Sequence, residues 1–299
     1  MGNLPRITVV TPSYNQGRYL EETIESVLMQ RYPNLEYFVI DGGSTDDSVA
    51  IIKKYSDKMK YWISEPDRGQ SHAINKGLRQ ATGEIMCWLN SDDVFLPGAL
   101  ACMGEMFQRS PRVDVLMGYT LLVDAEKRIE KCVYNLIKFT ALAKHGVIPF
   151  SQQSMFWRRE LMNRAGYLDE SLQTSMDTDL WIRFLKSGAR VRRINRYCAA
   201  WRLHDACKSV AFDGFSENKP PTAPSAALNT LDKDRLLLRE RHKDYRYRNT
   251  ARWARALYLI GKLSHGDYLR DLLFRIKWKN QPLEKLCASL DRMQLHNSL

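Results

Sequence analysis

Short apolar runs alternate with helix-like spacing over residues 7–110. The runs occupy residues 7–12, 36–40, 60–64 and 84–89. Such continuous apolar stretches are typical of strands that are buried on both faces. Helical spacing covers residues 18–30, residues 70–81 and the segment after Gly42-Gly43 that contains Val49, Ile51 and Ile52. Repeated strand–helix units predict a parallel sheet with right-handed crossovers.

The pattern after residue 110 is mixed. Residues 113–134 predict two antiparallel strands joined around 124–127, and residues 150–157 predict a further strand. The remaining expected elements are helices at 158–164 and 179–188 and one or two strands at 191–204. We therefore expect an α/β fold in which a mainly parallel central sheet is joined by a small antiparallel sheet.

A stretch rich in Pro, Ala and Ser begins at Asn218 and is followed by a basic, helical pattern. We expect an α/β domain at 1–217, a linker at 218–230 and a basic helical C-terminal extension at 231–299. The formal net charge is +11 and the pI is about 9.3. Residues 222–299 hold 16 Lys and Arg against 8 Asp and Glu, so the tail carries most of the excess charge.

The six cysteines form neither a CxxC pair nor a zinc-finger spacing, and several lie in apolar stretches, as buried free thiols do. A reducing compartment is the simplest interpretation. No apolar run approaches the roughly 20 residues of a membrane span, and none resembles a secretory signal. We therefore expect a cytoplasmic location.

Aspartates follow the apolar runs at four places. These are Asp41, Asp67, the pair Asp92 and Asp93, and Asp177. Carboxylates are seldom buried unless they are paired or bound to a metal, so stability gives no reason for them to recur at strand ends. Ligands of open α/β sheets bind at the carboxyl ends of the strands. The pattern predicts one acidic pocket for a divalent cation and a polar ligand.

Two of these segments have both a functional and a structural interpretation. The segment TPSYN at 11–15 and Asp41 could hold a base and a ribose, or could shape a loop and cap the next helix. Asp92 and Asp93 could divide a sugar hydroxyl and a hard cation between them, or could form a capping turn. Because no glycine-rich phosphate loop is present, a metal that neutralises phosphates fits the pattern.

Asp177 and His204 present the same choice. Asp177 precedes the helix expected at 179–188, where it could be an N-cap or a general base for an attacking hydroxyl. His204 ends the strand expected at 191–204 and could be a metal ligand or a structural residue. Each residue taken alone leaves the choice open.

Residues 250–263 have an amphipathic pattern, with Trp253, Leu257 and Ile260 on one face and arginines on a flank. A basic amphipathic helix suits an anionic membrane surface, but a solvated helix packed on the α/β domain would show the same pattern. Nucleic-acid binding could use the same charges. We expect no nucleic-acid partner, because the rest of the chain predicts an acidic pocket.

Together, residues 6 to 210 resemble the family 2 glycosyltransferases, which are inverting enzymes of the GT-A fold. The resemblance rests on TPSYNQGRYLEETIESVLMQ, YFVIDGGSTDDS, SEPDRGQSHAINKG, ATGEIMCWLNSDD, QQSMFWRREL, MDTDLWIRF and WRLHDACKS. It implies a single GT-A (Rossmann-like) domain. It also implies a hexosyl- or N-acetylhexosaminyltransferase that uses a nucleotide-diphosphate sugar, usually a UDP-sugar. With the basic tail, it suggests a lipid-linked glycan acceptor, polysaccharide biosynthesis for the cell envelope, and a peripheral position on the inner face of the cytoplasmic membrane.

The resemblance also implies roles for single residues. Donor binding falls to Thr11, Pro12, Tyr14, Asn15, Asp41, Asp67, Arg68, Lys76, Asn90 and Asp92. A Mn²⁺ or Mg²⁺ cofactor falls to Asp93 and His204. Acceptor contacts fall to Gln152, Gln153, Trp157 and Trp181. Asp177 aligns with the catalytic base in the family's Glu-Asp pair, and Met176 stands where the family has Glu.

The implied mechanism is one in-line displacement with inversion. The cation neutralises the leaving diphosphate while Asp177 removes the proton from an acceptor hydroxyl on the opposite side. One alternative is a sugar nucleotidyltransferase, which would be expected to open with a glycine-rich loop that TPSYNQG lacks. Another is a non-catalytic protein that binds nucleotide sugars, against which the presence of Asp93 and Asp177 argues.

Overall fold

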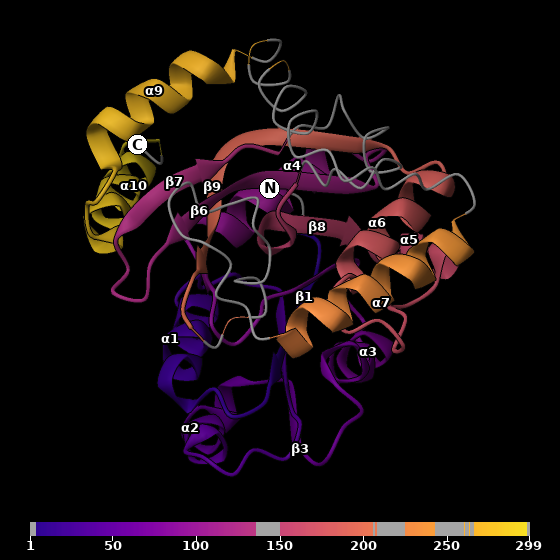
Figure 1. Ribbon diagram of the computed structural model, residues 1–299. Helices are drawn as coiled ribbons and strands as arrows, with labels where there is room; N and C mark the ends of the chain where they lie inside the picture. Colours follow the sequence, from indigo (N-terminus) through magenta and orange to yellow (C-terminus); the bar gives the residue numbers. More distant parts are fainter. Residues whose placement is uncertain are drawn as a thin grey trace.

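One nine-stranded mixed sheet organises the protein (Figure 1). The computed structural model describes residues 4–135, 150–205, 207, 225–242, 260, 263 and 266–297. The strand order is β3-β2-β1-β4-β8-β6-β9-β5, and β7 pairs with β6 beside this path. The α/β fold expected from the sequence is confirmed, and its antiparallel pairs extend the same sheet.

The first half of the sheet is parallel. Its strands are β1 (Ile7–Ser13), β2 (Leu35–Asp41), β3 (Tyr61–Ser64) and β4 (Ile85–Trp88). Every residue of β1 is buried, and its first residue lies opposite Leu35 on one side and Ile85 on the other. This central position explains the continuous apolar run, because both faces of β1 are covered by helices.

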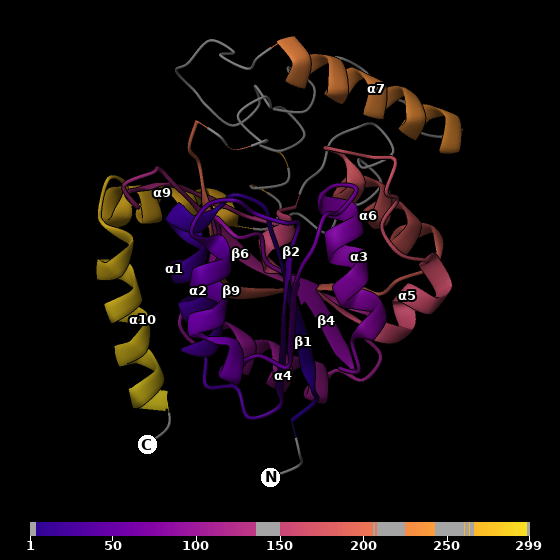
Figure 2. The same ribbon diagram turned by 90° about the horizontal axis from the view of Figure 1, so that it is seen from below.

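Four helices cover the parallel strands: α1 (Gly17–Leu28), α2 (Ser48–Lys54), α3 (Gln70–Gln80) and α4 (Ala99–Arg109), with a 3-10 turn η1 (Ser56–Lys58) after α2. Of these, the two helices with predicted bounds, α1 and α3, begin and end within two residues of those bounds. Helix α1 buries Leu20, Ile24 and Val27, which recur at helical spacing. Figure 2 shows α1 and α2 on one side of β1 and β4, and α3 and α5 on the other.

The second half of the sheet contains the antiparallel pairs. Its strands are β5 (Val94–Phe95), β6 (Val115–Val123), β7 (Ile129–Val133), β8 (Met155–Arg158) and β9 (Val191–Arg202). Strands β6 and β7 form the expected antiparallel pair. The strand expected at 150–157 starts only at Met155, because Gln152–Ser154 form a 3-10 turn, η3. The two-residue strand β5 is too short to leave a periodic signal in the sequence.

Five further helices complete the described chain. They are α5 (Arg159–Ala165), α6 (Met176–Lys186), α7 (Ser225–Arg241), α9 (Asp267–Trp278) and α10 (Leu283–Asn297). Helix α7 begins inside the segment expected as a linker, and its Leu238 is buried in the main core. Phe274 of α9 and Leu286 of α10 belong to a second core against β6 and β7.

The amphipathic pattern at 250–263 lies outside the described residues, except for Ile260 and Leu263. In the described part of the chain, every helix falls short of the length or the apolar character that crossing a membrane requires.

Candidate functional site

The loops after β1 and β2 are tied together at the carboxyl ends of these strands. Asn15, at a φ of 51°, donates its backbone N–H to Ser44 Oγ at 2.8 Å. Its side-chain Oδ1 accepts a hydrogen bond from the backbone N–H of Thr45 at 2.9 Å. The Asp46 carboxylate accepts from the backbone N–H of Gly17 at 2.8 Å. Asn15, an expected contact of the sugar donor, is therefore held between these two loops, which together we call the two-loop platform.

Asp41 anchors the second loop. This fully buried carboxylate accepts hydrogen bonds from the backbone N–H groups of Gly43 (3.1 Å) and Ser44 (2.9 Å), and from the hydroxyls of Ser44 (2.5 Å) and Ser64 (2.7 Å). Its observed contacts thus correspond to the structural interpretation of this residue. A direct contact between Asp41 and a donor stays a prediction.

Asp67 and Tyr14 close over Gly42. A Cβ atom placed on Gly42 would lie 2.6 Å from Asp67 Oδ2 and 3.3 Å from Tyr14 Cδ2, so only glycine fits without displacing a side chain. Asp67 is fixed from the other side, because its Oδ1 accepts from the backbone N–H of Gly69 at 2.7 Å. The Tyr14 side chain is 62% exposed, which leaves an aromatic face and the Asp67 carboxylate side by side.

The other expected donor residues differ in how accessible they are. Thr11 and Pro12 are buried in β1, and Thr11 Oγ1 accepts a hydrogen bond from Tyr37 Oη at 3.1 Å. Lys76 pairs with Glu65 at 2.8 Å, and exposed Arg68 pairs with Glu170. Thr11 and Pro12 are thus buried in the strand that carries the first loop, whereas the Arg68 side chain is exposed.

The turn after β4 buries the Asp93 carboxylate and leaves that of its neighbour Asp92 partly exposed. Asp93 accepts hydrogen bonds from the backbone N–H of Arg202 (3.1 Å), from Gln153 Nε2 (3.1 Å) and from Asn90 Nδ2 (3.2 Å). Burial and the negative charge of Asp92 raise the pKa of the Asp93 carboxyl well above its ordinary value. A nearby cation would favour the ionised Asp93 carboxylate and so oppose the rise in its pKa.

His204 reaches the same turn from the end of β9. Its Nε2 lies 3.1 Å from Asp92 Oδ2, and its ring lies against the ring of Tyr19 with centroids 4.5 Å apart. The sequence predicts that Asp93 and His204 share a cation, and the structure brings both to one turn. The direct partner of His204, however, is Asp92. Ligation by Asp93 itself stays a prediction.

This donor set is incomplete for a metal held by protein alone. Among the described residues, no group of three or more His, Cys, Asp or Glu side chains is placed to hold a metal. One imidazole and one or two carboxylates nevertheless fit Mn²⁺ or Mg²⁺ when ligand phosphates supply further oxygens.

The four expected acceptor residues separate into two pairs. Gln152 donates to the backbone carbonyl of Trp88 at 2.8 Å, and Gln153 donates to Asp93, so both lie at the β4 turn. The rings of Trp157 and Trp181 are instead 0% and 1% exposed and pack in the main core. Because neither ring presents a surface to a sugar, these two tryptophans are left out of the site.

Asp177 lies in the first turn of α6 and is half-buried. Its Oδ1 accepts from the backbone N–H of Thr178 at 2.6 Å and from the Thr178 hydroxyl at 3.3 Å. Burial raises the pKa of the Asp177 carboxyl above its ordinary value. Such a carboxylate is a stronger base than an exposed one. Met176, which stands in place of the family's Glu, is buried and adds no charge beside it.

Helix α7 fixes the segment that leads into α6, and the sequence pattern gives no sign of this. Buried Asp234 accepts from the backbone N–H groups of Gln173 (3.1 Å), Thr174 (2.7 Å) and Ser175 (3.0 Å) and from the Thr174 hydroxyl (2.8 Å). The N-cap residue Ser175 makes no capping bond with its own side chain. Asp234, on a distant helix, therefore fixes the backbone just before α6 and does not cap the helix itself, because a capping side chain accepts from the second or third helical residue.

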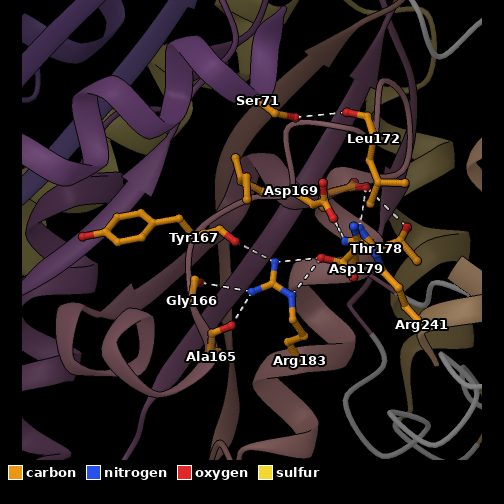
Figure 3. A network of polar contacts seen from close by, with 12 residues as sticks. Ser71, Ala165, Gly166, Tyr167, Asp169, Leu172, Thr178, Asp179, Arg183 and Arg241 are labelled. Atoms are coloured by element: carbon orange, nitrogen blue, oxygen red, sulfur yellow. Dashed lines mark hydrogen bonds and ion pairs between the residues drawn. The ribbon is translucent and has the colours of Figure 1, made fainter. Parts of the chain in front are cut away.

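Asp179 forms a second link between α6 and α7. It accepts from Arg183 Nε at 2.8 Å and lies 2.9 Å from Nε2 of His242, just after α7. Figure 3 shows the Arg183 guanidinium between Asp179 and the backbone carbonyls of Ala165, Gly166 and Tyr167, with Arg241 beside Asp169. Only the Asp179–Arg183 pair, four residues apart on one helix, has a recognisable sequence signal.

Comparison with known proteins identifies relatives along most of this chain. An uncharacterized glycosyltransferase of Rickettsia typhi is 29% identical over 68% of this chain and 65% of its own length. A second, from Rickettsia prowazekii, is 29% identical over 61% of this chain and 59% of its own length. The chain therefore spans less than two thirds of these two relatives. An uncharacterized glycosyltransferase of Mycobacterium tuberculosis is 33% identical over 61% of this chain and 70% of its own length.

Two solved structures share the fold at low sequence identity. S. aureus TarS (residues 1–349, in complex with UDP-GlcNAc) superposes with a TM-score of 0.55 at 17% identity, over 79% of this chain and 73% of that chain. The mannosyltransferase PcManGT of Pyrobaculum calidifontis, in complex with GDP-Man and Mn²⁺, gives a TM-score of 0.54 at 17% identity, over 89% and 88%. Both likenesses show the GT-A type of fold.

The sequence model described as "Glycosyl transferase family 2" matches residues 8–165, which include the two-loop platform and the Asp92–Asp93 turn. This match covers more than half of the chain, and it agrees with the fold and with the named relatives. The chain belongs to glycosyltransferase family 2.

Proposed function

We propose that this glycosyltransferase moves a sugar from a nucleotide-diphosphate sugar to a hydroxyl of a glycan or lipid-linked glycan, with inversion. One observation carries the proposal: Asp92, Asp93 and His204 meet at the ends of β4 and β9, with His204 Nε2 3.1 Å from Asp92 Oδ2. This turn lies at the carboxyl ends of the strands, where α/β sheets bind ligands.

The donor site is built on the loops after β1 and β2. Exposed Tyr14 and the neighbouring Asp67 suit a base and a ribose, because an aromatic face can stack while a carboxylate accepts hydroxyl hydrogen bonds. Nucleotide sugars in the two solved structures named above support this class of donor. We favour a UDP-sugar and transfer of a hexosyl or N-acetylhexosaminyl group.

Asp93 and His204, with Asp92 beside them, would hold Mn²⁺ or Mg²⁺ at the β4 turn. A bound cation there supplies charge neutralisation for the leaving diphosphate. The protein itself sets the arrangement: Gln153 and Asn90 fix Asp93, and the Tyr19 ring fixes the orientation of the His204 imidazole.

Asp177 acts as the base in this proposal. The raised pKa of Asp177 increases the affinity of its carboxylate for the proton of an acceptor hydroxyl. The positive end of the α6 dipole favours the ionised carboxylate, which is the form that accepts this proton. Gln152 and Gln153, which are 6% and 7% exposed, are the acceptor contacts we propose, because both lie at the β4 turn. The basic tail supports a lipid-linked acceptor and polysaccharide biosynthesis for the cell envelope, at the inner face of the cytoplasmic membrane.

A donor screen tests the proposal. Hydrolysis and transfer are measured with a panel of nucleotide sugars, with added Mn²⁺ or Mg²⁺ and after chelation. We expect Asp93→Ala to lose donor and metal binding, whereas Asp177→Asn keeps donor binding and loses turnover by a factor of about 10² to 10⁴. Asp57→Asn, at an exposed aspartate of η1, serves as the matched control.

Three results would contradict the proposal. Normal transfer by Asp177→Asn would refute the base. Donor binding without any turnover in the whole panel would favour a non-catalytic nucleotide-sugar-binding protein. Formation of a nucleoside triphosphate and a sugar 1-phosphate when pyrophosphate is added, in place of a nucleoside diphosphate, would favour a nucleotidyltransferase.

A further inference from the structure

Helix α9 presents an apolar face to solvent. Its exposed residues are Tyr268 (54%), Leu269 (62%), Leu272 (49%), Leu273 (58%) and Ile276 (76%). At 3.6 residues per turn, these five side chains fall within one arc of about 140°. We call this arc the outward face of α9. Contiguous exposed apolar groups of this kind mark interaction sites more often than isolated ones do.

The opposite face of α9 is polar and buried, which reverses the usual arrangement. Fully buried Asp267 pairs with Arg193 at 2.5 Å and with Arg270 at 3.0 Å. Asp271 pairs with Arg275 at 3.2 Å, and Phe274 packs against the Tyr197 ring with centroids 5.4 Å apart. An ordinary surface helix turns its apolar side inward. Here, rolling the helix to do so would take Asp267 away from Arg193 and leave the buried Arg193 charge without its carboxylate partner.

The outward face is therefore held toward an outside partner by ion pairs on its other side. Figure 1 shows α9 at the edge of the molecule, beyond β7. Ile260 and Leu263, which precede α9 in the chain, are also exposed, at 52% and 64%. They add further apolar side chains to the same part of the sequence.

The charges of this part of the chain favour an anionic lipid surface as the partner. Arg275 on one edge of the arc and Lys277 on the other flank the apolar side chains. Apolar side chains flanked by basic ones match the acyl boundary and the negative headgroups of an anionic membrane. A second copy of the chain, with a net charge of +11, would bring like charges together.

We infer that the outward face of α9 docks onto an anionic lipid surface, with Arg275 and Lys277 at the headgroups. This inference deepens the proposed function, because it gives the location at which a lipid-linked acceptor would be met. Docking depends on α9 alone, so it can be tested apart from the transfer reaction.

The test measures binding of the full chain to vesicles of phosphatidylglycerol with phosphatidylcholine, and to vesicles of phosphatidylcholine alone. The variant is the double substitution Leu272→Gln and Ile276→Gln. We expect anionic vesicles to bind the unsubstituted chain, and the variant to bind about tenfold more weakly or worse, because two apolar side chains no longer enter the lipid. Leu236→Gln on α7 and Met29→Gln after α1 are matched controls, at side chains that are 58% and 70% exposed.

Transfer to a soluble acceptor is measured in parallel and should be unchanged in the double variant. Vesicle binding that is equal in the variant and the unsubstituted chain would overturn the inference, as would no binding to anionic vesicles at all. Self-association that disappears in the variant would overturn it too, because the face would then join two copies of this chain. Lost transfer with retained vesicle binding in Asp177→Asn would separate the proposed chemistry from docking.

Discussion

Two buried aspartates in different halves of the molecule, Asp41 and Asp234, each fix a loop by accepting its hydrogen bonds, but one is adjacent to its loop in the sequence and the other is distant. Each carboxylate is at most 1% exposed and accepts hydrogen bonds from four donor groups, most of them in one loop. Asp41 ends β2 and holds the loop that directly follows it. Asp234 holds residues 173–175, which precede it by about sixty positions along the chain. One half is organised locally, and the other by a distant helix.

The family match at residues 8–165 ends before the segment that carries Asp177. The donor platform lies within residues 8–165, but the first turn of α6 that carries Asp177 is positioned by α7, outside that match. Helix α7 is consequently part of the proposed catalytic machinery. Two consequences can be tested separately: local anchors should affect donor binding, and the distant anchor should affect turnover.

The largest effect is expected for Asp234→Ala. The substitution leaves three backbone N–H groups without their acceptor, and a backbone group cannot rotate to find another, so we expect a loss of about 4 kcal/mol in the free energy of unfolding. Displacement of Asp177 should lower kcat about tenfold or more with little change in donor Kd. Urea unfolding and steady-state kinetics measure the two quantities.

The matched control is Asp232→Ala, two residues away on α7, where the side chain is 70% exposed and pairs with Arg235 at 2.9 Å. It should change stability by less than about 1 kcal/mol. If Asp234→Ala raised donor Kd and left kcat alone, the two halves would not divide binding from turnover, and the comparison would fail.

A smaller effect is expected for Asp41→Ala. Two of its four donors are hydroxyls, which can rotate toward other acceptors, so we expect a loss of about 3 kcal/mol in stability. The platform should loosen, and donor Kd should rise while kcat at saturating donor stays within about twofold. Asp47→Ala, at an exposed residue of the same loop, is the control. A fall in kcat with unchanged donor Kd would contradict this assignment.

Gly42→Ala tests the donor-binding half of the molecule by adding a single methyl group. The new Cβ would meet Asp67 Oδ2 at 2.6 Å, so the carboxylate must move away from its place beside Tyr14. We expect donor binding to weaken by about tenfold and stability to fall by about 1 kcal/mol. Gly188→Ala is the contrasting glycine: its added Cβ meets no atom within 4 Å, so any cost there comes from its φ of 77°. Isothermal titration with the donor distinguishes the two, because only Gly42→Ala should weaken binding.

The same contrast explains what could be predicted from the sequence. Buried parallel strands and amphipathic helices leave periodic signals, so β1 to β4 and α1 and α3 were located to within about two residues. Asp41, Asp67 and the pair Asp92–Asp93 also lie at or just after the ends of β2, β3 and β4, whereas Asp177 lies in the first turn of α6. Whether an aspartate such as Asp41 faces a ligand or its own loop has no periodic signal, because both roles place it at a strand end.

Contacts between distant segments are the part that the sequence hides. The anchoring of residues 173–175 by Asp234 depends on how α7 packs, and that packing rests on single side chains such as Leu238. Trp157 and Trp181 show that proximity to a site in the sequence does not predict a place in that site. A tryptophan next to a site in the sequence can point into the core, because strand and helix faces alternate on a scale of one or two residues.

The smallest expected effect is a pH dependence at Asp177, in the half held by α7. Burial raises its folded-state pKa above the ordinary 3.8, so the folded chain binds this proton more tightly than the unfolded chain does. The resulting stability is fully present below the unfolded pKa and is lost as the pH rises through the folded one. The Tm of the unsubstituted chain should therefore fall relative to Asp177→Asn as the pH is raised from about 3.8. Transfer should show the matching acid limb, since the base works only when ionised. A Tm difference that stays constant with pH would mean that the Asp177 environment does not favour the protonated form, and the base would then have to come from another part of the α6 loop.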